Sequence, residues 1–333
     1  MLKYLNHMWT YIKYYLRNNH LYTKYFQTRI NDIRYFAKNV RSYTTKYTVK
    51  KDKYILGNTI YLIFDPKLEH PGLADRLKVI CCCYYIAKIN HFNFKIIFET
   101  PFALSDYLIP NKVDWKASVN DLSYSLQNSR LLAYNGGGKI PKLNPKIKQY
   151  HIYHYIGKNI LQCNNIKNWE EIWRECYQEL FKPSEYLNNL LSTQNIIPKN
   201  YIAVHLRFVN ALGNFEKGFY NKISEDQRNK LINKCLSLID EIKNKNSKEL
   251  IIFSDSSLFL GHAVQHGYKT LNGNIGHISY CQDHSIFDKV FIDFYAIGLA
   301  DTVYRIKTKE LYNTTFSYYA SLANGAKFIN INE

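Results

Sequence analysis

The sequence YIAVHLRFVN, residues 201–210, decides the fold class of this chain. It begins as an apolar, β-branched run, which is typical of a parallel strand buried on both faces. It ends in three polar side chains, those of His205, Arg207 and Asn210. Ligands bind beyond the strand ends of open α/β sheets, and the planar guanidinium of arginine suits phosphate oxygens. Taken alone, the segment is better explained as an ordinary strand with an exposed polar end.

Strands and helices alternate on both sides of this stretch. Downstream, helices are expected at 225–243, at 291–301 and from the 313–317 turn to 324, and strands at 249–253, 302–306 and 327–331. Upstream, a strand at 59–64, a helix from 73 to 88 and a strand at 94–98 repeat the rhythm, and mixed loops and short elements are expected at 100–160. Alternation with short links predicts an α/β fold built on doubly wound parallel sheets.

The length of 333 residues predicts two domains, because single cores rarely grow to this size. A boundary is expected at 192–199, after a helical stretch and close to Pro198. We therefore expect domains at 54–195 and 196–333, preceded by an arm at 1–53.

The arm is distinguished by its charge. It contains twelve Lys or Arg residues and two Asp, so it carries ten of the seventeen net positive charges of the chain. Aromatic and aliphatic side chains recur in it at helical spacing, with cations between them. Such a basic amphipathic helical arm fits a peripheral contact of residues 1–48 with an anionic membrane, and equally a helix packed on the first domain. Nucleic acid is the less favoured partner.

The sequence also bears on the cellular compartment. It shows neither a secretory leader nor an apolar run of about 18 residues, the length that would span a membrane. Its seven cysteines are odd in number and include no C-x-x-C pair, which indicates reduced thiols. The expected location is cytoplasmic, at most peripheral at the inner face of a membrane.

Two further polar loop ends follow in the second half of the chain. Ser254-Asp255-Ser256 comes after the strand at 249–253, and Thr314-Thr315-Phe316-Ser317 precedes a helix. A carboxylate at a strand end can accept from the N–H edge of a guanine-like base, and an arginine with a helix N-terminus can hold a diphosphate without metal. The sequence has no D-x-D, the usual mark of a metal-chelating sugar-nucleotide site. The residues therefore favour a metal-free nucleotide-sugar site.

In this order, the motifs resemble those of the GDP-fucose-dependent fucosyltransferase superfamily, which includes α1,2-, α1,6- and protein O-fucosyltransferases. Its H-x-R-x-x-D motif is matched by 205–210, with Asn210 in place of the acid. Its strand ending in S/T-D is matched at 254–255, and its S/T-x-F-S at 314–317, after a helix containing Asp293. The turn at 71–77 is similar to the G-G-L-G-N-R-L loop, with Asp75 where Asn is usual. The resemblance spans roughly residues 57–331.

The resemblance implies a GT-B-like architecture with two Rossmann-like domains facing a cleft. It implies inverting, metal-independent transfer of fucose from GDP-fucose to a hydroxyl of a glycan acceptor. By the same resemblance, Arg207 holds the β-phosphate, and His205 and Asp255 lie beside the guanosine. The remaining implied donor-site positions are Asn210 in the first motif, Thr315, Phe316 and Ser317 at the phosphates, and Gly72 and Arg76 closing the cleft.

The catalytic base stays open between two carboxylates, Asp75 in the glycine turn and Glu216 in the loop after the arginine strand. Two alternatives to a fucosyltransferase also stay open. One is a related transferase that uses another GDP-sugar. The other is a non-catalytic GT-B-like protein that binds glycan or polyanion, and such a protein would keep Arg207 but would need neither carboxylate.

Overall fold

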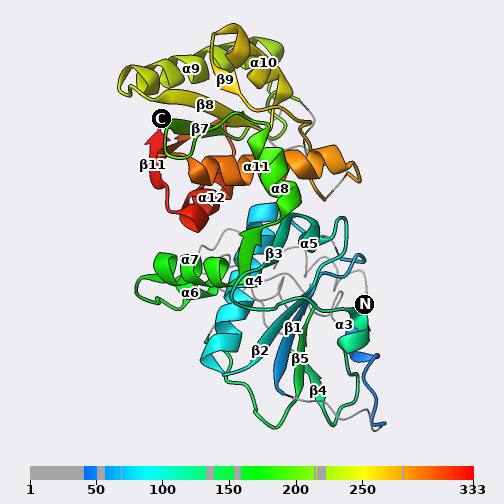
Figure 1. Ribbon diagram of the computed structural model, residues 1–333. Helices are drawn as coiled ribbons and strands as arrows, with labels where there is room; N and C mark the ends of the chain where they lie inside the picture. Colours follow the sequence, from blue (N-terminus) through cyan, green and yellow to red (C-terminus); the bar gives the residue numbers. More distant parts are fainter. Residues whose placement is uncertain are drawn as a thin grey trace, which may run out of the picture.

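The computed structural model describes residues 41–50, 57–68, 70–132, 139–153, 159–213, 215, 223–279 and 281–333 (Figure 1). Most of the arm and the candidate base Glu216 lie outside these ranges. The expected membrane contact of residues 1–48 therefore remains a prediction. None of the helices within the described ranges combines the length and the apolar character needed to cross a bilayer.

The first half of the chain forms a parallel sheet with the strand order β2-β1-β5-β4. Its strands are β1 (Thr59–Ile63), β2 (Asn93–Ile97), β4 (Ser129–Leu131) and β5 (Gln149–Ile152). Helix α4 (Leu73–Ile89) packs on β1 and β2. The strands β4 and β5 lie in the region expected to hold mixed loops and short elements, and each is too short to show an alternating pattern in the sequence.

The second half forms a five-stranded parallel sheet with the order β11-β10-β7-β8-β9. Its strands are β7 (Tyr201–Leu206), β8 (Glu249–Ser254), β9 (Lys269–Thr270), β10 (Thr302–Lys307) and β11 (Lys327–Asn332). Its helices are α9 (Glu225–Asn244), α10 (Ser257–Gln265), α11 (His284–Leu299) and α12 (Phe316–Asn324). The predicted α/β class and parallel sheets are confirmed.

Helix α11 begins seven residues before the expected start at 291. The side chain of Asp283 caps it by accepting from the amide of Ser285 at 2.9 Å. The C-terminal end of α12 was predicted correctly. Gly325, which follows the helix, adopts a left-handed conformation with φ 72°.

Alternate residues of β7 face two different cores. Ile202, Val204 and Leu206 pack against the core that includes α9 and α10. Tyr201 and Ala203 belong to the larger core, which continues through α11, α12 and α4 into the first sheet. His205 and Arg207 follow Tyr201 and Ala203 at spacing two, so they share the face that looks toward the first half of the chain.

Helices join the two sheets, which lie at opposite ends of the molecule in Figure 1. Helix α12 contacts α4 and α7 (Trp169–Leu180), and α11 contacts α8 (Glu185–Ser192), which precedes the expected boundary. A small antiparallel pair, β3 (Leu108–Pro110) with β6 (Phe181–Pro183), lies beside this junction. The limits of 54–195 and 196–333 stay a prediction, since one hydrophobic core runs through both halves.

The described end of the arm packs on the first sheet. The ring of Tyr43, in α3 (Arg41–Thr44), stacks on Tyr153 with centroids 4.2 Å apart. The hydroxyl of Tyr47 is 2.8 Å from Nδ1 of His151, and the ammonium of Lys46 lies over the Tyr43 ring. Residues 41–50 thus follow the packed-arm interpretation. All seven cysteines are free thiols and five are buried, as expected for reduced cysteines.

Candidate functional site

Two adjoining cavities open where the two halves of the chain meet. The larger has a volume of about 630 Å³ and is lined by the turn between β1 and α4 from the first half, and by Arg207, Phe215, 276–279 and 312–316 from the second. The smaller, of about 60 Å³, lies between the ends of β7 and β8 and helix α11. Arg207, Phe215 and Phe316 line both cavities, so the two form one continuous site.

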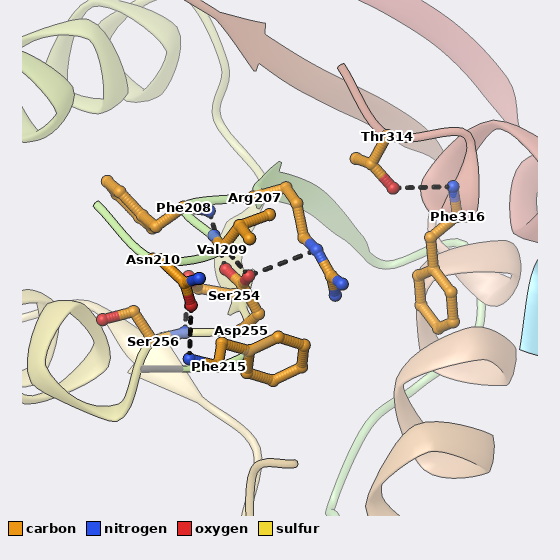
Figure 2. Close-up of polar contacts among 10 residues, drawn as sticks. All are labelled: Arg207, Phe208, Val209, Asn210, Phe215, Ser254, Asp255, Ser256, Thr314 and Phe316. Atoms are coloured by element: carbon orange, nitrogen blue, oxygen red, sulfur yellow. Dashed lines mark hydrogen bonds and ion pairs between the residues drawn. The ribbon is translucent and has the colours of Figure 1, made fainter. Parts of the chain in front are cut away.

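Asp255 fixes Arg207 at the junction of the cavities (Figure 2). Its Oδ2 lies 3.2 Å from Nε of Arg207, and the two side chains are 3% and 18% exposed. The same carboxylate accepts the amides of Phe208 and Val209, each at 2.7 Å. Burial raises the pKa of Asp255, while Arg207 and the two amides oppose that rise. The carboxylate therefore holds both the guanidinium and the loop that carries it.

The loop after β7 stores backbone strain. Val209 has φ 53°, a left-handed conformation that is rare for a β-branched residue. Its amide bond to Asp255 helps to hold that conformation. Asn210 is 1% exposed, and its Oδ1 accepts the amide of Phe215 at 2.8 Å. Asn210 is not among the described residues that line either cavity, and its bond to Phe215 shapes the loop. Its implied contact with the donor stays a prediction.

The loop after β7 also places Phe215 against Arg207. Its ring lies under the Arg207 guanidinium, 4.4 Å from ring centroid to Cζ, and its edge meets the ring of His277. A guanidinium stacked on an aromatic face is held in orientation as well as in place. Arg207 is thus fixed by a carboxylate and an aromatic ring, and no sequence pattern pointed to the ring.

His205 is buried beside the smaller cavity and keeps an unused polar atom. Its Nδ1 has no hydrogen-bond partner among the described residues, and its ring lies 5.8 Å from that of Phe316. Burial, with Arg207 and Arg305 nearby, lowers the pKa of His205 to about 3. The imidazole is therefore neutral at physiological pH, and a buried polar atom without a partner favours a ligand that supplies one.

The N-terminus of α12 forms one wall of the larger cavity. Phe316 donates its amide to Oγ1 of Thr314 at 3.1 Å, and the Arg305 guanidinium donates to the Thr314 carbonyl. Thr315 is exposed and lines the larger cavity, as the resemblance implies. The hydroxyl of Ser317 is buried, has no partner among the described residues and lines neither cavity, because its side chain turns into the core. The expected hydroxyl contact of Ser317 with phosphate stays a prediction.

An ion pair that the sequence analysis did not assign to the site lines the smaller cavity. Nζ of Lys289 lies 2.5 Å from Oδ1 of Asp293, one turn further along α11, and the side chains are 3% and 14% exposed. Gly273 allows this burial: with φ 129°, it lies where an added Cβ would come within 2.7 Å of the Lys289 Cδ. The i, i+4 spacing was visible in the sequence, but the helix was not expected to begin before 291.

The first half contributes the turn at the N-terminus of α4. Gly72 and Asp75 line the larger cavity, as does Lys78, whose Nζ is 2.6 Å from Oδ1 of Asp75. Arg76 does not line it. Its guanidinium is 1% exposed beneath the turn, donates to the Pro71 carbonyl at 2.7 Å, and has its pKa lowered to about 9 by burial. Its Nη2 also donates to Oγ of Ser279, in the second half of the chain, at 3.5 Å. The expected role of Arg76 in closing the cleft stays a prediction.

The described ranges contain no cluster of three or more His, Cys, Asp or Glu side chains placed to hold a metal ion. The metal-independent chemistry implied by the resemblance stays a prediction, as does the role of Glu216, which lies outside the described residues.

No protein-family model and no curated protein matches this chain. Among solved structures, its fold matches that of NodZ, an α-1,6-fucosyltransferase. A NodZ crystal structure soaked with GDP-fucose superposes with a TM-score of 0.54 at 13% identity, covering 80% of this chain and 92% of NodZ. NodZ from Bradyrhizobium superposes with a TM-score of 0.53 at 12% identity and covers 80% of this chain and 93% of that protein. NodZ co-crystallised with GDP superposes with a TM-score of 0.52 at 13% identity, with coverages of 80% and 92%. The chain therefore has the GT-B-like fold of these fucosyltransferases, as its motifs predicted.

Proposed function

We propose that this chain is a glycosyltransferase that moves fucose from GDP-fucose to a hydroxyl of a glycan acceptor, with inversion at the sugar carbon and without a metal ion. The observation that carries the proposal is Arg207, fixed by Asp255 at the strand end that faces a cavity between two parallel sheets. The shared fold with a fucosyltransferase supports the choice of donor.

In this proposal the diphosphate lies between Arg207 and the N-terminus of α12. The guanidinium is oriented before the ligand arrives, because Asp255 and Phe215 hold it. The first amides of a helix have no intrahelical acceptor, and the helix dipole favours negative charge at this end. Both features stabilise the charge that gathers on the leaving GDP, so they act in the transition state more than in the ground state.

The smaller cavity is the proposed subsite of the guanine base. Guanine presents a carbonyl oxygen next to N–H donors on one edge, so it needs a donor beside an acceptor. Lys289 and Asp293 offer that arrangement side by side, and His205 offers a further polar atom. Asp255 is less suited to contact the guanosine, as the resemblance implied, because two loop amides and Arg207 already occupy its oxygens.

Asp75 is the proposed base among the described residues. The acceptor oxygen attacks the sugar carbon as the bond from that carbon to the β-phosphate oxygen breaks, and the bonding electrons leave with GDP. The hydroxyl proton passes to the Asp75 carboxylate, which lines the larger cavity. The products are an α-linked fucoside, GDP and a protonated carboxyl group.

The test is incubation of the purified protein with GDP-fucose in the presence of EDTA, followed by detection of GDP. We expect slow GDP release by hydrolysis without an acceptor and faster release with a suitable glycan. The anomeric configuration of the product, measured by NMR, reports inversion. A protein that binds GDP yet releases none from GDP-fucose under any of these conditions would be a non-catalytic binder, and activity with another GDP-sugar alone would correct the donor.

A further inference from the structure

The first half of the chain places a cation in the larger cavity, opposite Arg207. Lys78 lies in the second turn of α4, and its side chain is only 9% exposed. It lines the same cavity as Arg207 and the start of α12. Neither the strand-end pattern nor the family motifs point to Lys78, so its place in the cavity is a finding of the structure.

The two cations of the cavity are held in different ways. The partner of Arg207 is a carboxylate that is 3% exposed and is anchored by two backbone amides. A partner of Lys78 is Asp75, which is 34% exposed and lies three residues earlier on the same helix. An exposed carboxylate regains hydration when it lets go of a cation, so the separation of Lys78 from Asp75 costs less than that of Arg207 from Asp255.

We propose that the diphosphate of the donor takes Lys78 from Asp75, and that this exchange makes the Asp75 carboxylate available to the acceptor hydroxyl. A diphosphate carries more charge than one carboxylate and offers several acceptor oxygens, so it competes well for an ammonium group. The proposal rests on the function proposed above, since it requires a diphosphate in the larger cavity.

The exchange gives an order to the reaction. Before the donor binds, Oδ1 of Asp75 accepts from Lys78, so this oxygen is engaged. After it binds, Lys78 contacts phosphate and Asp75 can accept the acceptor proton as the new glycosidic bond forms. Donor binding thus precedes activation of the acceptor, and an empty donor site leaves the base occupied.

The test compares the affinities of GDP and guanosine, measured by calorimetry in EDTA, for the wild type and three single variants. Lys78→Met keeps the length of the stem but removes the charge. It should weaken GDP about tenfold, the scale of one charge-assisted contact, and leave guanosine unchanged. Asp75→Asn removes the competitor for Lys78, so it should tighten GDP about threefold or more while lowering kcat. Lys88→Met is the matched control, because Lys88 lies on the same helix as Lys78, pairs with Glu179 of α7 and lines neither cavity.

The proposal requires that GDP affinity change in opposite directions, weaker in Lys78→Met and tighter in Asp75→Asn. The double variant should bind GDP like Lys78→Met alone, since Asp75 has no cation left to release. Unchanged or weaker GDP binding by Asp75→Asn overturns the exchange, and this variant suffices if Lys78→Met does not fold. Equal loss of GDP and guanosine in Lys78→Met assigns Lys78 to structure and also overturns it. A wild-type protein that binds no GDP removes the proposed function itself, together with the exchange.

Discussion

The two walls of the large cavity are built alike but held differently. Each is a loop that follows the end of a parallel strand, β1 in the first half and β7 in the second. In the second wall, Arg207 is tied to a buried carboxylate, to a stacked ring and to a strained loop. In the first wall, Lys78 pairs with a carboxylate that remains one-third exposed.

This difference teaches how one site can combine fixed and exchangeable charge. A cation that must stabilise a transition state gains from a partner that never leaves, because no reorganisation is then needed during the reaction. A cation that must change its contacts when a ligand binds needs a partner that the ligand can replace. The predictions for Arg207 and Asp255 test whether the second wall is the fixed one.

The largest effect is expected at Arg207. Arg207→Ala should lower turnover of GDP-fucose by at least about 100-fold, the scale of losing one preorganised donor. Arg207→Lys keeps the charge but loses the planar fork and the stacking on Phe215, so it should not restore activity. Steady-state kinetics measure both. Arg130→Ala, at an exposed arginine that lines neither cavity, is the control and should retain near-wild-type turnover. Near-wild-type turnover by Arg207→Ala would refute the site.

A smaller loss is expected at Asp255. Asp255→Asn keeps the shape of the side chain but turns one acceptor into a donor, which faces the amide of Phe208 or Val209. We expect turnover to fall by about tenfold or more, and the free energy of unfolding to fall by about 1–3 kcal/mol. Chemical denaturation measures the second quantity. Equal stability and activity in this variant would show that the second wall does not depend on Asp255.

Two glycines near the site differ in the room that an added methyl group would have. Gly273→Ala should destabilise the protein by about 1–3 kcal/mol and weaken GDP, because φ is 129° and the new Cβ would lie 2.7 Å from the Lys289 Cδ. Gly72→Ala should change stability by less than about 0.5 kcal/mol, since φ is −60° and the nearest atom, Nε2 of His277, is 3.7 Å away. Thermal unfolding with and without GDP checks the pair. The reverse order of effects would contradict the account.

The smallest expected effect is on the pH dependence of stability. It concerns two buried histidines, one in a central strand of each sheet. His151 in β5 has both ring nitrogens within hydrogen-bonding distance of a partner, Tyr47 and Gln149, whereas Nδ1 of His205 in β7 has none among the described residues. Burial lowers the pKa of His151 to about 4 and that of His205 to about 3.

Below pH about 6.5 the unfolded chain takes up protons on these histidines that the folded chain refuses, so stability falls as the pH drops toward 4. Each histidine contributes at most about 1.4 kcal/mol per pH unit. Denaturation at pH 7 and pH 5 should show a shallower loss in His205→Asn than in the wild type. An identical pH dependence in both proteins would show that His205 is not held neutral.

Site residues could be predicted from the sequence where the end of a strand determines their position. They could not be predicted where tertiary packing decides the direction in which a side chain points. Arg207 and His205 were found because alternation along a buried strand places both on one face. For Arg76 and Ser317, a motif gives the position on a helix but not whether the side chain faces the cavity or the core. Lys78, Phe215 and Lys289 were missed because only the approach of the two halves, or of a loop, brings them to the cavity.

The most direct test of the central claim is a calorimetric titration of the wild-type protein with GDP and with UDP, each in buffer containing EDTA. The account predicts that GDP binds under these conditions and that UDP binds at least about tenfold more weakly, a difference of about 1.4 kcal/mol. This follows from the proposed guanine subsite lined by Lys289 and Asp293 and from the proposed diphosphate site built on Arg207. Equal affinity for UDP, or loss of GDP binding in EDTA, would contradict it.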